Sequence, residues 1–545
     1  MSPSKVDRQD LDEVPILIIG SGPFGLLLAY MLAKLNIQTL LAHALSPRSL
    51  EICRQFDLDV NKIRMVGTSR KGAYWVNFIT NLCGGQVGRL PYERMDPGVL
   101  DSTPTMIHNI PQPAFEDLVA MELSKSTLVD MRKNHSFVRL EQRRPAVQGH
   151  VLTTVEDRSA GREYIVKSTH FLGVECEGED SYETMMTIPF NADLRPVVGD
   201  RVGMLHWIMD PEAAGFIISY DLSGNQVLIC NSDTQKYPPE SWDEALCRKT
   251  INAAIGKEIE YDVLSYRPWI LRDVHNLAYK LAATHQGWGG DRLLHSYQAD
   301  RRQVALVNSK QSVKNGQKIF GLLKSIGTTD SRDSVEVARQ NLYRNLQDPE
   351  GSSQISHGIE QREHFDNLRL HIGYVYGDPK IPDQASLFKA ACNPGARLPH
   401  AWIHPLAPLQ CRIQQPPIDS SYVWELSQDQ VKAKQYSTLD LCGFDRFTLL
   451  VNSTSVGKWK KILQEVRNTF LIAAPTDSAL KLDMAVLNVD FQVDTGSQGA
   501  EWVKLMRLNE GQATLVRPDQ QILACFEAAA AGTDIFDAIK SHLDW

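Results

Sequence analysis

Several signatures of common protein classes are missing from this 545-residue sequence. Its nine cysteines are scattered and none forms a CxxC pair, which argues against zinc ribbons, thioredoxin-type redox pairs and a disulfide framework. Neither HExxH nor GxSxG occurs, so zincin and serine-hydrolase chemistry are not indicated and we expect no metal. Basic residues are not in excess: 57 Lys and Arg against 65 Asp and Glu give a net charge of −8, which argues against a nucleic-acid partner.

What is present is typical of a large globular protein with a full core. The composition is 43% hydrophobic and 22% charged, and such a length predicts about three or four domains. The first thirteen residues mix basic and acidic side chains, unlike the start of a secretory signal peptide. Together with the scattered cysteines, this predicts a reducing, cytoplasmic location.

One uncharged run, residues 14–33, is long enough to cross a membrane. Gly20, Gly22, Pro23 and Gly25 lie in its middle, however, and such a cluster interrupts a helix. We therefore interpret the run as a strand, a turn and a helix, and we expect no membrane span.

The turn in this run carries a nucleotide-binding pattern. Val14–Ile19 is continuously apolar, as in a strand buried on both faces. It leads into a GxGxxG made of Gly20, Ser21, Gly22, Pro23, Phe24 and Gly25. A helix over about 23–35 and a second strand over 37–41 are predicted to follow. Here the glycines permit a tight turn and a close approach to a diphosphate, and the helix N-terminus attracts the anion. A glycine-rich turn that binds no nucleotide is the alternative.

Four later segments resemble the FAD-dependent aromatic-ring monooxygenases, of which phenol hydroxylase and p-hydroxybenzoate hydroxylase are members. Residues 46–52 (SPRSLEI) are similar to the family's "PRTLEI" helix start, and 109–116 (NIPQPAFE) to its cofactor-contacting stretch. Residues 272–281 (RDVHNLAYKL) resemble the "DAHNLAWKL" helix beneath the flavin, and 297–305 (YQADRRQVA) the "YEAERRPVA" that follows it. The resemblance implies that the cofactor contacts in these segments are Arg48, Gln112, Asp273 and Asn276.

The resemblance also implies a fold, which is α/β (α+β mixed). A Rossmann-like FAD-binding domain would occupy residues 1–183 and 266–378, interleaved with a β-sheet substrate domain at 184–265. Residues 379–545 would form a C-terminal thioredoxin-like domain. Because that extension has no CxxC, we expect it not to catalyse thioredoxin-type dithiol redox reactions. We expect it to serve packing or the formation of a homodimer.

The reaction implied by the resemblance is a hydroxylation. FAD, with NADPH as its transient reductant, would serve to transfer one oxygen atom of O2 to a phenolic or polyketide-like aromatic substrate. Phenol degradation or secondary metabolism would be its context. Tyr266 and Arg267 are the candidate catalytic residues, because they lie where the family places groups on the substrate side.

The chain departs from the family pattern at three places. The acidic residue after the second strand is missing, because Leu41 runs almost directly into Ser46. An Asp-Gly motif is missing after Gly173, and a Gly-Asp motif is missing after Leu271. Losing two carboxylate contacts would remove about 3–6 kcal/mol of binding free energy. The alternative function is therefore a non-catalytic or truncated relative that does not retain FAD.

The central part of the sequence predicts a sheet followed by helices. Short apolar runs divided by turn residues predict strands at 185–190, 201–209, 215–220 and 226–230. Helices are predicted over about 292–323 and 334–346, and a polar loop over 348–356. His206, Trp207 and Tyr220 are candidates to line an aromatic pocket on this sheet, with ordinary sheet packing as the alternative.

Overall fold

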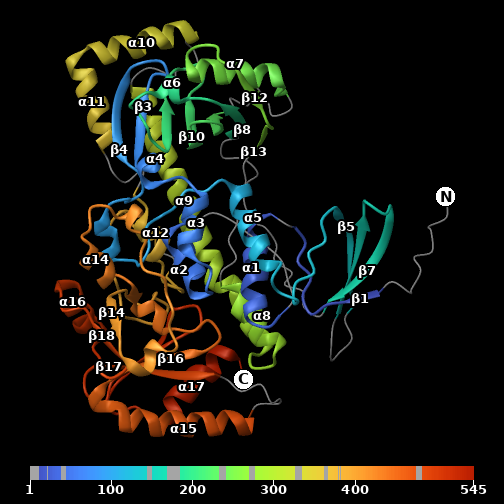
Figure 1. The fold of residues 1–545 in the computed structure, drawn as a ribbon, viewed down its shortest axis with the longest axis vertical. Coiled ribbons are helices and arrows are strands. Elements are labelled where there is room, and N and C mark those ends of the chain that lie inside the picture. The colour runs from blue at the N-terminus through green and yellow to red at the C-terminus, as the bar shows by residue number, and fades with distance from the viewer. Residues whose placement is uncertain are drawn as a thin grey trace.

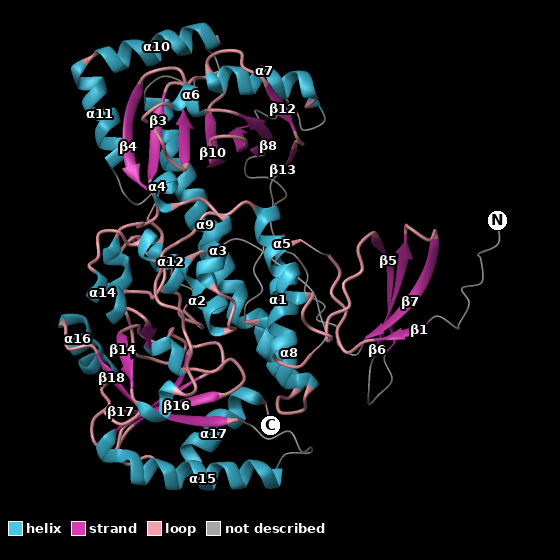
Figure 2. Ribbon diagram, viewed as in Figure 1, coloured by secondary structure: helices cyan, strands magenta, loops and turns pink. Residues whose placement is uncertain are grey.

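The computed structural model describes residues 11–20, 22–37, 45–143, 150–168, 185–231, 241–268, 276–325, 334–360, 366–378, 380, 382–473 and 481–544. These residues form three mixed sheets with helices between and around them, which confirms the predicted mixed α/β class. Figure 1 shows one sheet at each end of the long axis, a cluster of helices in the middle, and a small sheet that stands to one side. Figure 2 shows the same division by secondary structure.

The middle of the molecule is built around the helix that follows the glycine-rich turn. α1 (Pro23–Lys34) packs against α5 (Gln112–Leu123) and α8 (Leu277–His285). Residues 26–32 of α1 are all buried, as expected for an uncharged helix with neighbours on every side. α2 (Pro47–Gln55) and α3 (Val60–Val66) complete the same core. The predicted helix over 23–35 is confirmed.

The prediction for the first strand is wrong in its position. β1 (Leu11–Glu13) pairs in parallel with β7 (Arg162–Ser168), and residues 14–20 form no strand. A strand needs a hydrogen-bonding neighbour along its length, and β7 ends one residue after its last bond to this segment, at Lys167. The small sheet continues through β6 (His150–Asp157) to β5 (His135–Arg143). The predicted second strand lies outside the described residues, apart from Ile37.

The predicted central sheet is present and has additional strands. Its order is β12-β8-β11-β10-β9-β3-β4, and β13 also pairs with β8. The strands are β3 (Trp75–Ile79), β4 (Gln86–Pro91), β8 (Met185–Ala192), β9 (Leu205–Ile208), β10 (Gly215–Asp221), β11 (Asn225–Asn231), β12 (Tyr261–Val263) and β13 (Arg267–Pro268). α7 (Glu244–Ile255) covers one face, while α10 (Val335–Gln347) and α11 (Pro349–Glu360) cover the other.

The helices after this sheet agree with the sequence except at one place. α9 (Asp291–Ser325) has 35 residues, which gives it a length of about 52 Å, and α10 begins after Ser334, as predicted. The polar loop predicted at 348–356 is instead part of α11. Its apolar residues Ile355 and Ile359 are buried, and Ile359 lies against Gly88 of β4. Tertiary packing of one apolar face therefore outweighs the polar composition of the segment.

The third sheet has the order β15-β14-β18-β17-β16-β19-β20. Its strands are β14 (Trp402–Pro405), β15 (Tyr436–Ser437), β16 (Phe447–Asn452), β17 (Leu482–Leu487), β18 (Phe491–Val493), β19 (Ala513–Val516) and β20 (Ile522–Phe526). α15 (Val456–Ala473) and α17 (Gly532–Leu543) pack on one face and α16 (Ser497–Met506) on the other. The shorter helices are α4 (Arg70–Ala73), α6 (Arg195–Val198), α12 (Leu368–Ile372), α13 (Ala407–Gln410) and α14 (Gln428–Ala433). Among the helices of the described segments, none has the length and hydrophobicity to span a bilayer.

Candidate functional site

The glycine-rich turn presents open backbone at the start of α1. Gly22 is the N-cap residue, no side chain caps the helix, and its first turn has no acidic residue. A Cβ atom built on Gly20 or on Gly22 would meet nothing within 4 Å, and both residues are exposed. The first N–H groups of α1 are therefore accessible to an anion. Ser21 and the side chains of Pro23 and Phe24 lie outside the described residues, and Gly25 is half-buried.

Arg48 is held at the start of α2 by a buried polar network. Ser46 caps the helix by accepting from the backbone N–H of Ser49 at 3.2 Å, and Pro47 follows in the first turn. Arg48 Nη1 donates to Glu51 Oε2 at 2.8 Å and to Gln520 Oε1 at 2.7 Å. The guanidinium group of Arg48 thus connects the helix cluster to the C-terminal sheet.

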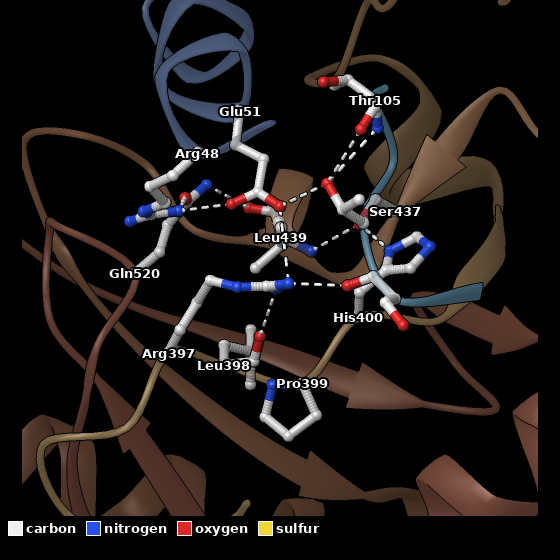
Figure 3. Close-up of polar contacts among 12 residues, drawn as sticks. Arg48, Glu51, Thr105, Arg397, Leu398, Pro399, His400, Ser437, Leu439 and Gln520 are labelled. Atoms are coloured by element: carbon white, nitrogen blue, oxygen red, sulfur yellow. Dashed lines mark hydrogen bonds and ion pairs between the residues drawn. The ribbon is translucent and has the colours of Figure 1, made fainter. Parts of the chain in front are cut away.

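Glu51 is the acidic centre of this network. Its Oε1 accepts a hydrogen bond from Thr103 at 2.7 Å and lies 3.4 Å from Arg397 Nη2. Figure 3 shows Glu51 on its helix, with Arg48 on one side and Arg397 below it. Arg48, Glu51 and Arg397 are all buried. Two guanidinium groups therefore share one carboxylate away from water.

Asn276, which immediately precedes α8, reaches the same part of the C-terminal sheet. Its Nδ2 donates to Asp519 Oδ2 at 2.7 Å, and Arg48 Nη2 donates to the backbone carbonyl of Asp519, also at 2.7 Å. Arg517 closes the group with a 2.7 Å bond to Asp519 Oδ2. Two of the residues predicted to contact the cofactor therefore meet at residues 519–520. Asp273, which was predicted with them, lies outside the described residues.

Gln112 is not part of this group. It begins α5, and its Nε2 donates to Glu116 Oε1 one helical turn later at 2.8 Å. The resemblance implied a cofactor contact for Gln112, whereas the observed bond of Gln112 stays within its own helix.

The residues present fit FAD at two points. The uncapped start of α1 offers backbone N–H groups and space to a diphosphate, as a dinucleotide site requires. Arg48 Nε and Asn276 Oδ1 are buried and have no hydrogen-bond partner among the described residues, and such atoms are costly unless something satisfies them. The places of the three missing family motifs, after Leu41, Gly173 and Leu271, lie in segments outside the described residues.

The candidate catalytic residues lie at the edge of the central sheet. Tyr266 stands in the loop between β12 and β13 and is 43% exposed. Arg267 pairs with Thr187 of β8 through its backbone, and its side chain lies outside the described residues. Figure 1 places β13 at the end of the sheet nearer the middle of the molecule.

The aromatic candidates on the sheet have neighbours in the core. Trp207 stacks on Phe216 with ring centroids 4.9 Å apart and on Phe78 at 6.4 Å. It belongs to the core that α10 and α11 cover, and Tyr220 packs against the same core. His206 is fully buried, and its Nε2 lies 3.0 Å from the carbonyl oxygen of Arg201. Because a carbonyl only accepts, Nε2 carries the proton. Sheet packing therefore accounts for these three residues.

His206 predicts an acid-dependent loss of stability. Burial lowers the pKa of His206 to about 4, while an unfolded histidine has a pKa of about 6.5. Below pH 6.5 the unfolded state gains a proton that the folded state does not, so stability falls as the pH falls toward 4. Between pH 7 and pH 5 we expect His206→Gln to lose about 2 kcal/mol less stability than the parent. Urea unfolding at both pH values measures this, with exposed His404→Gln as the control. Equal losses in the parent and His206→Gln would contradict the assignment.

Glu51, Arg397, Asp519 and Gln520 were not predicted from the sequence. Glu51 lies three residues after Arg48 in the same motif, so helical spacing alone would have found it. The other three lie in a segment and a turn far along the chain. Their polar side chains form no local pattern, and only the fold brings them to α2.

Comparisons with known proteins agree with this geometry. A family model described as "FAD binding domain" matches residues 13–272 and 270–312, more than half of the chain. The chain is 22% identical to a 2,4-dichlorophenol 6-monooxygenase of Delftia acidovorans, over 98% of this chain and 99% of that protein. It is 21% identical to a phenol 2-monooxygenase of Pseudomonas sp. (strain EST1001), over 97% of this chain and 92% of that protein.

Solved structures share the fold. The flavin-dependent monooxygenase PieE, in complex with FAD and substrate, superposes with a TM-score of 0.75 at 20% identity, covering 98% of this chain and 99% of that one. Aklavinone-11 hydroxylase, in a ternary complex with FAD and aklavinone, has a TM-score of 0.69 at 16% identity and covers all of both chains.

Proposed function

The chain belongs to the FAD-dependent aromatic-ring monooxygenase family, and from this premise we propose that it hydroxylates a phenolic or polyketide-like ring with O2 and NADPH. The observation that carries the proposal is the open, uncapped glycine-rich turn at the start of α1. Activation of O2 and its transfer to the ring are the chemistry that FAD supplies when it is bound. The 2,4-dichlorophenol and phenol monooxygenases support a phenolic ring. A putative polyketide hydroxylase of Streptomyces halstedii, 23% identical over 73% of this chain and 79% of that protein, supports a polyketide-like one.

The protein's own residues have three tasks in this proposal. The backbone N–H groups of Gly22 and the first turn of α1 bind the diphosphate of the cofactor. Arg48 and Asn276 orient the cofactor through Nε and Oδ1, the buried atoms that lack partners in the described chain. Tyr266 and Arg267, at the edge of the central sheet, hydrogen-bond the substrate on its polar side.

The proposal also assigns a role to each part of the chain. Residues 1–183 and 266–378 hold FAD, and 184–265 hold the substrate together with β3, β4, Tyr266 and β13, which belong to the same sheet or its edge. Residues 379–545 pack against the FAD-binding part through the network of Glu51 and Arg397. That packing role is supported by the buried contacts of Arg48 with Asp519 and Gln520.

A glycine variant tests the cofactor site separately from the fold. Gly22 has φ −69° and ψ −179°, which alanine adopts without strain, and an added Cβ meets no protein atom. We expect Gly22→Ala to keep the parent's stability but to raise the Kd for FAD roughly tenfold, or about 1.4 kcal/mol, because the methyl group holds the diphosphate away from the backbone. Titration with FAD of each protein after its bound flavin has been removed, followed by flavin fluorescence, measures this.

The matched control is Gly457→Ala, another glycine with open space around its Cβ position, on α15. It should bind FAD like the parent. Unchanged affinity in Gly22→Ala would remove the turn from the site. A parent that retains no FAD after desalting, or that oxidises NADPH at the same rate with and without phenolic substrates, would overturn the proposed function.

A further inference from the structure

Two cysteines from distant parts of the sequence lie in contact in the C-terminal sheet. The sulfur atoms of Cys392 and Cys525 are 3.9 Å apart, although the residues are 133 positions apart in the chain. Cys525 is on β20, opposite Thr514 of β19. Cys392 comes three residues before Gly395, whose N–H bonds the first residue of β20, Ile522. Neither cysteine is part of a CxxC, so the pair is visible only in the fold.

Backbone hydrogen bonds hold the two segments in register beside the sulfurs. The N–H of Ile522 donates to the carbonyl of Ala396 at 2.8 Å, and the N–H of Gly395 donates to the carbonyl of Ile522 at 2.9 Å. Leu398 continues the pairing with a 2.9 Å bond to Gln520. The backbone of both segments is therefore held together three residues away from each cysteine, which keeps the two sulfurs near each other.

We propose that Cys392 and Cys525 form a redox-active dithiol that a peroxide oxidises to an intramolecular disulfide. A disulfide has an S–S distance of about 2.05 Å, so each sulfur must move by roughly 1 Å, which a small side-chain rotation provides. The site rests on no property of the FAD-binding turn and goes beyond the proposed hydroxylation.

The reaction balances with hydrogen peroxide as the oxidant. The Cys525 thiolate attacks one peroxide oxygen, the O–O bond breaks, and the released hydroxide takes up a proton to leave as water. The Cys392 thiol then attacks the oxidised sulfur of Cys525, loses its proton, and displaces the hydroxyl group as a second water. Each sulfur gives up one electron, and the peroxide accepts both.

The pKa and the exposure of each cysteine indicate which one reacts with the oxidant and which one resolves the product. Either sulfur can donate in the contact between the two thiols. As the donor, the Cys392 thiol lowers the pKa of Cys525 to about 7, and the Thr514 side chain acts in the same direction. The same contact raises the pKa of Cys392. Cys525 is exposed, whereas Cys392 is half-buried. Cys525 is therefore the thiolate that meets the oxidant, and Cys392 is the resolving thiol.

The experiment treats the full-length protein with hydrogen peroxide and counts alkylatable thiols by intact mass. We expect the parent to lose two hydrogen atoms and two alkylatable thiols per chain, and peptide mapping to identify a Cys392–Cys525 link. Cys411→Ser should behave like the parent, because the thiol of exposed Cys411 bonds a carbonyl of its own turn. Cys392→Ala should form no disulfide and leave Cys525 as a sulfenic acid that dimedone traps.

Several outcomes would overturn the inference. These are a parent that forms no disulfide, a link that maps to other cysteines, or an equal loss of thiols in Cys525→Ala. Thermal unfolding and far-UV circular dichroism check that both alanine variants are folded. If either is not, the peptide map of the oxidised parent decides alone. The pH midpoint for alkylation of Cys525 should also rise in Cys392→Ala, and an unchanged midpoint would contradict the hydrogen bond between the thiols.

Discussion

Replacing Glu51 by alanine is expected to lower the free energy of unfolding by about 3–5 kcal/mol, the cost of breaking a buried ion pair from one side. Glu51 is 1% exposed and is the carboxylate between Arg48 and Arg397. Without it two buried guanidinium groups face each other without the one carboxylate that pairs with both among the described residues, and the hydroxyl of Thr103 loses its carboxylate partner. Urea unfolding of the two proteins measures the difference.

The control for this variant is Glu244→Ala, which removes an exposed carboxylate that pairs with Arg248 one turn later on α7. Its expected cost is about 0.3–0.5 kcal/mol, as for other exposed helical pairs. A second variant, Glu51→Ala with Arg397→Met, should recover part of the loss, because it removes one of the uncompensated charges. If Glu51→Ala cost no more than Glu244→Ala, the network would not hold the C-terminal sheet in place.

This network shows what could and could not be predicted from the sequence. Arg48 was identified because residues 46–52 resemble the helix start of the family, and the structure has a helix there, with Ser46 as its cap and Pro47 in its first turn. Arg397 and Gln520 have no comparable pattern. They lie more than three hundred residues away along the chain, in a segment and a turn whose conformation is set by the sheet that they join. The resemblance therefore identified the residue but not its partners.

The same contrast applies to the secondary structure. β8, β10 and β11 were predicted because short apolar runs between turn residues are a local signal. The strand predicted at 14–19 failed because an apolar run becomes a strand only where another strand pairs with it, and β7 ends beside Val14. α11 was missed for the opposite reason. Its sequence is polar, and the two isoleucines that pack it against β4 make those contacts only in the folded protein.

Replacing Trp402 by alanine should cost about 3–5 kcal/mol, the range for removing a large aromatic side chain from a core. Trp402 begins β14, is 1% exposed, and packs in a core with Leu100 and Val99, which are about three hundred residues earlier in the chain. Its Nε1 donates to the carbonyl of Leu100 at 2.9 Å. The side chain therefore supplies both apolar contact and a hydrogen bond where the C-terminal sheet meets the rest of the chain. Limited proteolysis should then release the C-terminal part earlier than in the parent.

Two further tryptophan variants separate the two contributions of Trp402. Trp402→Phe keeps most of the buried ring and loses the indole N–H, so it should cost about 1 kcal/mol. Trp424→Ala removes the same side chain from a site that is 51% exposed, where Arg70 stacks on the ring at 4.3 Å, and should cost about 0.5–1 kcal/mol. The loss of stability should be largest for Trp402→Ala and smaller for Trp402→Phe and Trp424→Ala, because Trp402 is the more buried ring. A Trp402→Ala protein as stable as Trp424→Ala would mean that the Trp402 side chain does not hold the two parts of the chain together.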